Sequence, residues 1–384
     1  MVMNLFNDEA LKTKAEIKSD KLKELEIKEA EKLIHENEKK RMKDLADSIN
    51  DSAFWMSYCG MQKAVRQCDV ERSTRLAFVA WIKNPWFMYR RLHTILVEDI
   101  GGANPELILE FADFRKNGRS YKNWSDMAWM IGELATSKKC RDGDLTNNAW
   151  KAFTRYAERD PYIKAMKERH PHIQMFNKPV FSNYSRPEFP EFQTDENLKR
   201  ILTYCEYQQD SLAGEGQALS VPYNCLDRQR REAAGFTVEI ENNLTSPSHG
   251  EWFKDIVPYT VLDTHAAHGK KTMDIWKKKV KEREPEFKDY FGIDEENLPI
   301  LLFFMEGAKC SQDFNFGGFR DPIMRFIAYA RGLKPEIPFE EFEIAFHERM
   351  LVPLKGLRTW VFNKFYGKVV DNIWETIGKM KDFE

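Results

Sequence analysis

The first fifty residues carry a dense mixture of acidic and basic side chains with few apolar ones, and residues 8–47 contain neither proline nor glycine. Lysine, glutamate, leucine and alanine dominate this stretch, and they are strong helix formers. Leu22, Leu25 and Leu33 give only an interrupted apolar stripe, which is a poor match to coiled-coil heptads. We therefore expect residues 1–50 to form a solvated helical arm, with a specific coiled coil as the alternative.

Apolar residues recur at helical spacing between residues 51 and 157. Leu76, Val79 and Ala80 follow this spacing, and a second set begins near Phe87. The dipeptide Asn104-Pro105 predicts a helix end followed by a new helix, because proline is accepted in a first turn. We expect residues 51–157 to form a helical domain.

Prolines and glycines then become frequent over residues 158–260, which we interpret as a linker and irregular region. Within it, Phe236–Ile240 alternates in polarity and predicts a short strand. Residues 261–384 return to helical patterning. The predicted fold class is mainly α: a helical domain followed by a second, mostly helical domain, with irregular Pro/Gly-rich segments.

Composition limits the classes of function. Hydrophobic residues make up 42% and aromatic residues 13% of the chain, which is enough for packed cores. The net charge of −2 provides no general basic field, so any nucleic-acid contact must come from a local patch. Without a membrane-spanning apolar run or a signal-peptide pattern, we expect a cytoplasmic protein with no membrane partner. The six cysteines show no zinc-ligand spacing, so we expect reduced thiols, no metal site and no cofactor.

A series of ordered motifs lies within the helical range. The stretch Met61-Gln-Lys-Ala-Val-Arg66-Gln-Cys-Asp69 is followed by Arg90-Arg91-Leu92, then by Glu98-Asp99-Ile100-Gly101 and Ala103-Asn104-Pro105. Over about residues 54–155 this order resembles the helical C-terminal, or collar, domain of the MgsA/RarA-type clamp-loader ATPases. That family has Lys-Ser-x-Arg-x-x-Asp, Arg-Arg-Leu and Glu-Asp-Ile-Gly-x-Ala-x-Pro in the same order.

The resemblance implies a domain that packs protomers together, and hence a homo-oligomer. It does not imply ATPase activity, because the sequence contains no GxxxxGK[ST] phosphate loop. Leu134-Ala135 and Asn147-Asn148-Ala149-Trp150 resemble a further segment of the family, separated here by an insertion around residues 140–144. The remainder of the chain resembles no family that we recognise.

Arg90, Arg91, Glu98 and Asp99 are the candidate fold or interface residues of this motif. The arginines and carboxylates stand seven to nine positions apart, so they can pair between a helix and the following turn or across a subunit interface. A catalytic pair of carboxylates is the less favoured alternative.

The string Asp263-Thr-His265-Ala-Ala-His268-Gly-Lys270-Lys271 is the candidate catalytic segment, with Asp263 and His265 as its candidate residues. The Asp-Thr-His triplet resembles a segment of helix-hairpin-helix DNA glycosylases in which the aspartate is catalytic. That family's Leu-Pro-Gly-x-Gly hairpin and its upstream lysine are missing here. The alternatives are a metal site that includes His268 and, as the favoured interpretation, a helix start capped by Asp263 or Thr264.

Two segments are rich in basic residues, 270–281 and 351–370, and the second contains no acidic residue. Cations for phosphates combined with aromatic faces for bases are typical of single-strand binding. The alternative is an amphipathic helix with a buried aromatic face and a solvated basic face. The candidate nucleic-acid contacts are Lys270, Lys271, Lys355, Arg358, Trp360, Lys364 and Tyr366.

Together these patterns predict a DNA replication or repair accessory protein without ATPase activity. It would oligomerise or dock through the collar-like domain and contact DNA, single-stranded DNA included, or a replication or repair protein. The alternative is an enzyme that acts on nucleic acid or nucleotides, glycosylase-like or base-modifying, through Asp263 and His265.

Overall fold

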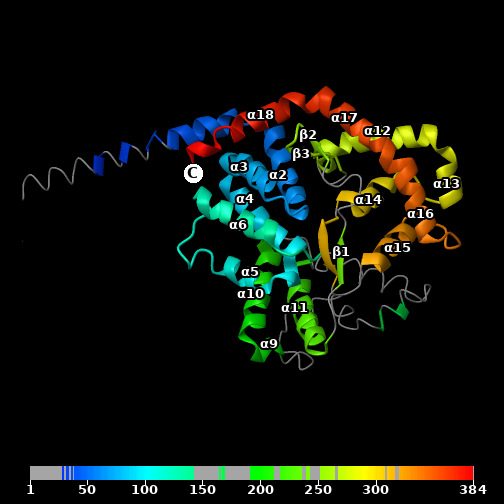
Figure 1. The fold of residues 1–384 in the computed structure, drawn as a ribbon, viewed down its shortest axis with the longest axis horizontal. Coiled ribbons are helices and arrows are strands. Elements are labelled where there is room, and N and C mark those ends of the chain that lie inside the picture. The colour runs from blue at the N-terminus through cyan, green and yellow to red at the C-terminus, as the bar shows by residue number, and fades with distance from the viewer. Residues whose placement is uncertain are drawn as a thin grey trace, which may run out of the picture. The chain divides into compact units, whose positions relative to one another are not determined.

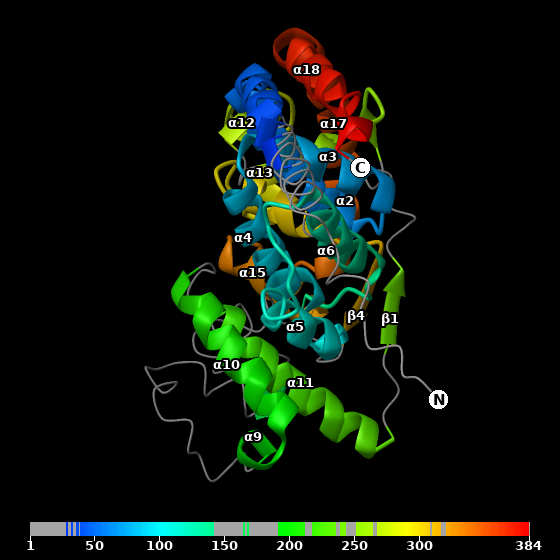
Figure 2. The ribbon, with the colours of Figure 1, turned by 90° about the vertical axis from the view of Figure 1, so that its left-hand side faces the viewer.

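The computed structural model describes residues 28–29, 32–33, 36–37, 39–141, 164–165, 167–168, 191–211, 217–235, 239–242, 251–263, 267–307, 309–315 and 320–383. The chain divides into two units, Met1–Ser48 and Ile49–Glu384. In the first unit, residues 39–48 are helical and mostly exposed. The second unit, drawn in Figures 1 and 2, is mainly α-helical, and its described strands form two small two-stranded sheets. This confirms the predicted fold class.

The early helices of the second unit begin at asparagine or aspartate caps. In each case the side chain accepts a hydrogen bond from the backbone N–H three residues further on, which satisfies a group that the helix itself leaves unpaired. Asn104 caps a helix that starts at Pro105, as the sequence predicted. The helices and their caps are α2 (Asp51–Arg66, Asn50), α3 (Val70–Lys83, Asp69), α4 (Pro85–Ile95, Asn84), α5 (Pro105–Ala112, Asn104) and α6 (Trp124–Thr136, Asn123).

Helix α3 forms the centre of this group. Every residue from Leu76 to Ile82 is buried, so this part of the helix is apolar all round and is covered on several sides. It packs against α2, α4 and α6, and the Trp81 indole N–H donates to the Tyr121 carbonyl at 2.9 Å.

The chain turns between α4 and α5 through a π-helical turn, η2 (Leu96–Ile100), and a 3-10 turn, η3 (Gly101–Ala103). Gly101 has φ +43° and ψ −126°, a backbone conformation that a residue with a Cβ atom rarely adopts. A Cβ atom on Gly102 would lie 3.5 Å from the backbone of Asn224. The corner therefore needs glycine at position 101 for its backbone conformation, whereas a methyl group at position 102 would make an ordinary contact with the neighbouring helix.

That neighbouring helix lies in a region expected to be irregular. Its described residues instead include α10 (Glu196–Ser211) and α11 (Gln217–Ala233), which lie side by side beneath α5, and the short α9 (Glu191–Thr194) precedes them. Pro222 lies inside α11 and removes one backbone hydrogen bond. Burial of Val221, Cys225 and Leu226 against the rest of the unit compensates for this loss.

A buried polar contact connects this helical pair to the early helices. His93 of α4 and Tyr204 of α10 are both at least nine-tenths buried, and Nδ1 of His93 lies 2.5 Å from the Tyr204 hydroxyl. Burial, assisted by the charge of Arg115, lowers the pKa of His93 from 6.5 to about 3, so the imidazole is neutral at physiological pH.

The two sheets are short. β1 (Glu239–Asn242) pairs antiparallel with β4 (Gln312–Asn315), with Glu239 opposite Asn315. β2 (Trp252–Phe253) pairs with β3 (Val257–Pro258). Only the end of the strand predicted over Phe236–Ile240 falls in β1, and residues 236–238 lie outside the described part of the chain.

The C-terminal half is a run of helices interrupted by π-helical turns. Its last long helix, α18, packs on α2 and α3, and the Asn372 side chain accepts a hydrogen bond from the Asn50 backbone at 3.2 Å. The expected domains 51–157 and 261–384 therefore share one compact unit. The elements are η6 (Tyr259–Val261), α12 (Ala267–Arg283), α13 (Pro285–Phe291), α14 (Leu298–Leu302), η7 (Phe303–Gly307), α15 (Arg320–Ala330), α16 (Phe339–Phe346), η8 (His347–Leu351), α17 (Val352–Val361), η9 (Phe362–Tyr366), α18 (Gly367–Ile377) and η10 (Met380–Asp382).

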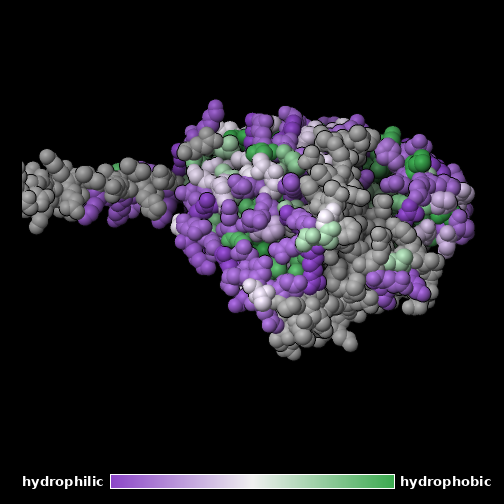
Figure 3. All heavy atoms as spheres, turned by 60° about the horizontal axis from the view of Figure 1, so that its bottom comes forward, coloured by the Kyte–Doolittle hydropathy of each residue, from purple (hydrophilic) through white to green (hydrophobic). Residues whose placement is uncertain are grey.

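On the face shown in Figure 3, the described residues are mostly hydrophilic and the hydrophobic ones form small separate patches. Among the described helices, none combines the length and the apolar character that crossing a membrane requires.

The glycine corner gives a first prediction. We expect Gly101→Ala to lower the free energy of unfolding by about 1–3 kcal/mol, because alanine is strained at this backbone conformation. Gly132→Ala in α6 is the matched control: nothing lies within 4 Å of the added methyl group, and alanine favours the helix by about 0.5–1 kcal/mol. Urea unfolding of both variants measures the difference, and equal effects would contradict the strain.

The buried imidazole gives a second prediction. Above pH 6.5 His93 is neutral in both the folded and the unfolded state, so it makes no pH-dependent contribution. As the pH falls from 6.5 towards about 3, the unfolded state takes up a proton that the folded state does not. Stability should therefore fall by about 1.4 kcal/mol per pH unit from this residue alone. His93→Gln should flatten the dependence of unfolding free energy on pH in this window, and an unchanged slope would contradict the assignment.

Candidate nucleic-acid interface

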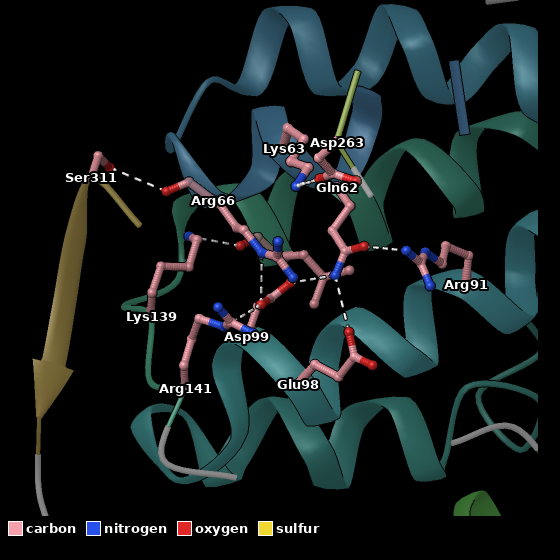
Figure 4. A network of polar contacts seen from close by, with 11 residues as sticks. Gln62, Lys63, Arg66, Arg91, Glu98, Asp99, Lys139, Arg141, Asp263 and Ser311 are labelled. Atoms are coloured by element: carbon pink, nitrogen blue, oxygen red, sulfur yellow. Dashed lines mark hydrogen bonds and ion pairs between the residues drawn. The ribbon is translucent and has the colours of Figure 1, made fainter. Parts of the chain in front are cut away.

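The motif residues of α2 and of the η2 turn form a buried polar network around Asp99 (Figure 4). Asp99 is fully buried, and its Oδ1 atom lies 2.9 Å from Nε of Arg66 and 3.2 Å from Nε of Arg141. Its Oδ2 atom accepts a hydrogen bond from Gln62 at 2.8 Å, and the same amide donates to Glu98 at 3.1 Å. Burial by itself raises the pKa of Asp99, but the two guanidinium groups and the Gln62 bond outweigh it and hold this pKa below its usual value.

The pairing within this network differs from the one expected from sequence. Asp99 forms ion pairs with Arg66 and Arg141, two residues that the sequence did not indicate as its partners. Arg91 reaches the network indirectly, by donating to the Gln62 side-chain oxygen. The prediction placed these carboxylates in a turn after a helix, and they do lie in the π-helical turn η2, from which Asp99 contacts α2.

The network also holds the segment after α6. The Cys140 backbone N–H donates to the Asp99 carbonyl at 2.9 Å. Lys139 is fully buried, and its ammonium group donates to the carbonyls of Leu134, Ala135 and Ser137 at the end of α6. A cation at this position is stabilised by the negative end of the helix dipole. These residues therefore organise the fold.

Asp263, the candidate catalytic residue, is also engaged inside the protein. Its Oδ2 atom lies 2.7 Å from Nζ of Lys63, and both side chains are almost completely buried. Burial lowers the pKa of Lys63, and the attraction of Asp263 only partly restores it. The second candidate, His265, lies outside the described residues.

The backbone of Gly269 packs directly against the backbone of Asp263. A Cβ atom at position 269 would lie 1.8 Å from the Asp263 carbonyl oxygen, so no other residue fits without a backbone shift. His268 is half-buried, which lowers its pKa, and its ring lies 5.2 Å from that of Tyr366. In the part of the chain that the structure describes, no group of three or more His, Cys, Asp or Glu residues could hold a metal ion.

The structure divides the predicted nucleic-acid contacts into two sets. Arg358 is only 3% exposed and forms a two-pronged ion pair with Glu306, with nitrogen–oxygen distances of 2.8 and 2.7 Å. Lys355 is exposed but pairs with Glu251 at 2.5 Å. The prediction that Arg358 contacts nucleic acid is therefore wrong, because the helical pattern of α17 places it on the buried face.

Three of the other predicted contacts, Lys271, Trp360 and Lys364, lie with Phe365 at one exposed place, and we call these four residues the cation–aromatic surface. Nζ of Lys364 lies 4.7 Å from the Trp360 ring and 5.5 Å from the Phe365 ring. Nζ of Lys271, from α12, lies 4.2 Å from the Phe365 ring. Trp360 is 45% exposed and Phe365 38% exposed, so both rings remain accessible. Two segments far apart in the sequence thus supply one surface.

A π-helical turn produces this arrangement. In a regular α-helix, residues five apart point about 140° away from each other. Across η9 the turn is wider, and the rings of Trp360 and Phe365 lie 5.8 Å apart, nearly perpendicular to each other. Phe365 was not among the predicted contacts, although it is one of the aromatic residues of the basic segment 351–370.

Lys270 and Lys368 are exposed on the elements that carry this surface, and Tyr366 is half-buried beside His268. Within the described residues, Lys270, Lys271, Lys364 and Lys368 form no ion pair with an acidic side chain, in contrast to Lys355. The surface therefore carries uncompensated positive charge in a protein whose net charge is −2.

The Lys63–Asp263 pair gives a third prediction. Lys63→Met should lower the free energy of unfolding by about 3–5 kcal/mol, because it leaves a buried carboxylate without its counterion. The double variant Lys63→Met/Asp263→Leu should recover most of that loss. Lys281→Met, which removes an exposed partner of Glu295, should cost less than about 1 kcal/mol. A double-mutant cycle in urea measures the coupling, and additive effects would contradict the pairing.

Comparisons with protein-family models, with curated proteins and with solved structures found no match to this chain.

Proposed function

We propose that this protein binds single-stranded nucleic acid through the cation–aromatic surface and acts as a DNA replication or repair accessory protein without ATPase activity. The observation that carries the proposal is the clustering of Lys271 and Lys364 around the exposed rings of Trp360 and Phe365.

The chemistry of the surface supports a single strand over a duplex. Unstacked bases can stack on accessible aromatic rings, whereas bases within a duplex keep their faces covered. The lysines beside the rings supply cations for the flanking phosphates, and their charge is not neutralised by described acidic side chains. A buried aromatic face would leave no ring for a base, but Trp360 is 45% exposed.

The collar-like resemblance supplies the replication or repair context, and the assembly that it implies is a separate part of the proposal. Gln62, Arg66 and Asp99 are buried within a single chain, so a homo-oligomer would use other, exposed residues. Light scattering at micromolar concentration tests this part, and a strict monomer would contradict it.

The surface gives a fourth prediction. In fluorescence anisotropy, labelled single-stranded oligonucleotide should bind more tightly than duplex of the same sequence. Lys271→Ala and Lys364→Ala should each weaken binding and reduce the slope of log K against log salt by about 0.7, since each removes one phosphate contact. Trp360→Ala should cost about 1–3 kcal/mol of binding energy while leaving the salt slope unchanged, because stacking releases no counterion.

Lys281→Ala is the matched control. This lysine lies on α12, as Lys271 does, but it pairs with Glu295 at 2.9 Å, so its removal should change affinity little. Equal losses for Lys281→Ala and Lys271→Ala would indicate a diffuse charge effect and contradict the surface. No binding at low salt would overturn the proposal.

A further inference from the structure

A cavity lies among α4, α5 and α10, away from the elements that carry the cation–aromatic surface. It has a volume of about 370 Å³, within the range of small-molecule sites. Half of its ten lining residues are the aromatic residues Trp86, Tyr89, Phe111, Tyr204 and Tyr207. Trp86 is 43% exposed and stacks on Tyr89 with ring centroids 5.7 Å apart. Flat aromatic faces with an accessible edge suit a flat heterocycle.

Two buried polar groups on the wall have unused hydrogen-bonding capacity. His93 and Gln208 are each 3% exposed, and Nε2 of His93 and Oε1 of Gln208 have no hydrogen-bond partner. Buried polar atoms without partners are uncommon in folded proteins, because each costs about 1–3 kcal/mol. Among the described residues, they therefore mark a place on the cavity wall where a ligand could complete the hydrogen bonding.

The contacts of His93 define what these two groups offer. Its Nδ1 atom faces both the Tyr204 hydroxyl at 2.5 Å and the Gln208 amide nitrogen at 3.4 Å. An amide nitrogen can only donate, so Nδ1 accepts, and the neutral ring carries its proton on Nε2. The wall thus holds one unused donor, on His93, and one unused acceptor, on Gln208.

Two arginines, Arg90 and Arg115, line the same cavity. Arg115 is exposed and forms no ion pair with a described residue, and its guanidinium carbon lies 6.0 Å from the Tyr89 ring. A guanidinium group in this position can bind a phosphate in the two-pronged geometry that arginine favours.

From these three features we propose that the cavity between α4, α5 and α10 binds a nucleotide, with its base between the aromatic side chains and its phosphate on Arg115. The edge of a base presents neighbouring donors and acceptors, which complement the unused pair on His93 and Gln208. An aliphatic anion would leave the aromatic wall and this pair unused. The nucleotide is either free in solution or one residue of a nucleic-acid strand, because both sources share this chemistry.

The test is calorimetric titration of the full-length protein with the four ribonucleoside 5′-monophosphates, the matching nucleosides, ribose 5-phosphate and inorganic phosphate. We expect at least one monophosphate, or a short oligonucleotide in a parallel titration, to bind at least tenfold more tightly than ribose 5-phosphate. Arg115→Ala and Trp86→Ala, both at exposed positions, should each weaken that binding about tenfold. Lys116→Ala is the matched control, since this neighbouring lysine is 79% exposed and does not line the cavity.

The two sources of nucleotide separate within the same experiment. Binding of a monophosphate identifies a free nucleotide, whereas binding of the oligonucleotide alone identifies a residue of a strand. Repeating the titrations with Lys271→Ala/Lys364→Ala keeps this proposal distinct from that for the cation–aromatic surface, because the double variant should retain binding that depends on Arg115. No binding of either ligand, or binding unaffected by Arg115→Ala and Trp86→Ala, would overturn the nucleotide site.

Discussion

The buried carboxylate of Asp99 is the interaction on which the arrangement of the early helices depends. A charged group with no exposure to water is stable only when its partners replace the lost hydration. Arg66, Arg141 and Gln62 do so here, and they come from α2 and from the segment after α6. Helix α2 also supplies Lys63, which pairs with Asp263. One helix therefore takes part in two buried ion pairs, one with the η2 turn and one with the segment before α12.

Several of the chemically distinctive residues lie in π-helical turns. Asp99 lies in η2, Glu306 in η7 and the cation–aromatic surface spans η9. A π-helical turn changes the angular relation between residues before and after it, so it can turn one side chain inward or bring two rings together without ending the helix. At η9 this produces an exposed pair of rings, while at η7 it contributes to the buried partner of Arg358.

The cation–aromatic surface and the α4–α5–α10 cavity both combine aromatic rings with basic side chains, but they do so in different ways. The surface offers exposed rings beside lysines, whose point charges suit a mobile phosphate chain. The cavity combines partly exposed rings with arginines and with a buried donor and acceptor, and we propose that these suit one particular heterocycle. Under the two proposals, the first arrangement would tolerate many sequences and the second would discriminate between bases.

The sequence by itself determined the mainly helical class, the helix starts at residues such as Asn104, and the segments that supply Lys271, Trp360 and Lys364, because capping and helical periodicity are local properties. Only the tertiary structure decided that Arg358 is buried, that Asp99 pairs with Arg66 and Arg141, and that Lys271 meets Phe365. It also formed α11 across Pro222, where burial compensated for a locally unfavourable residue. These outcomes depend on which helix faces which, and a pattern of nearby residues does not specify contacts between distant parts of the chain.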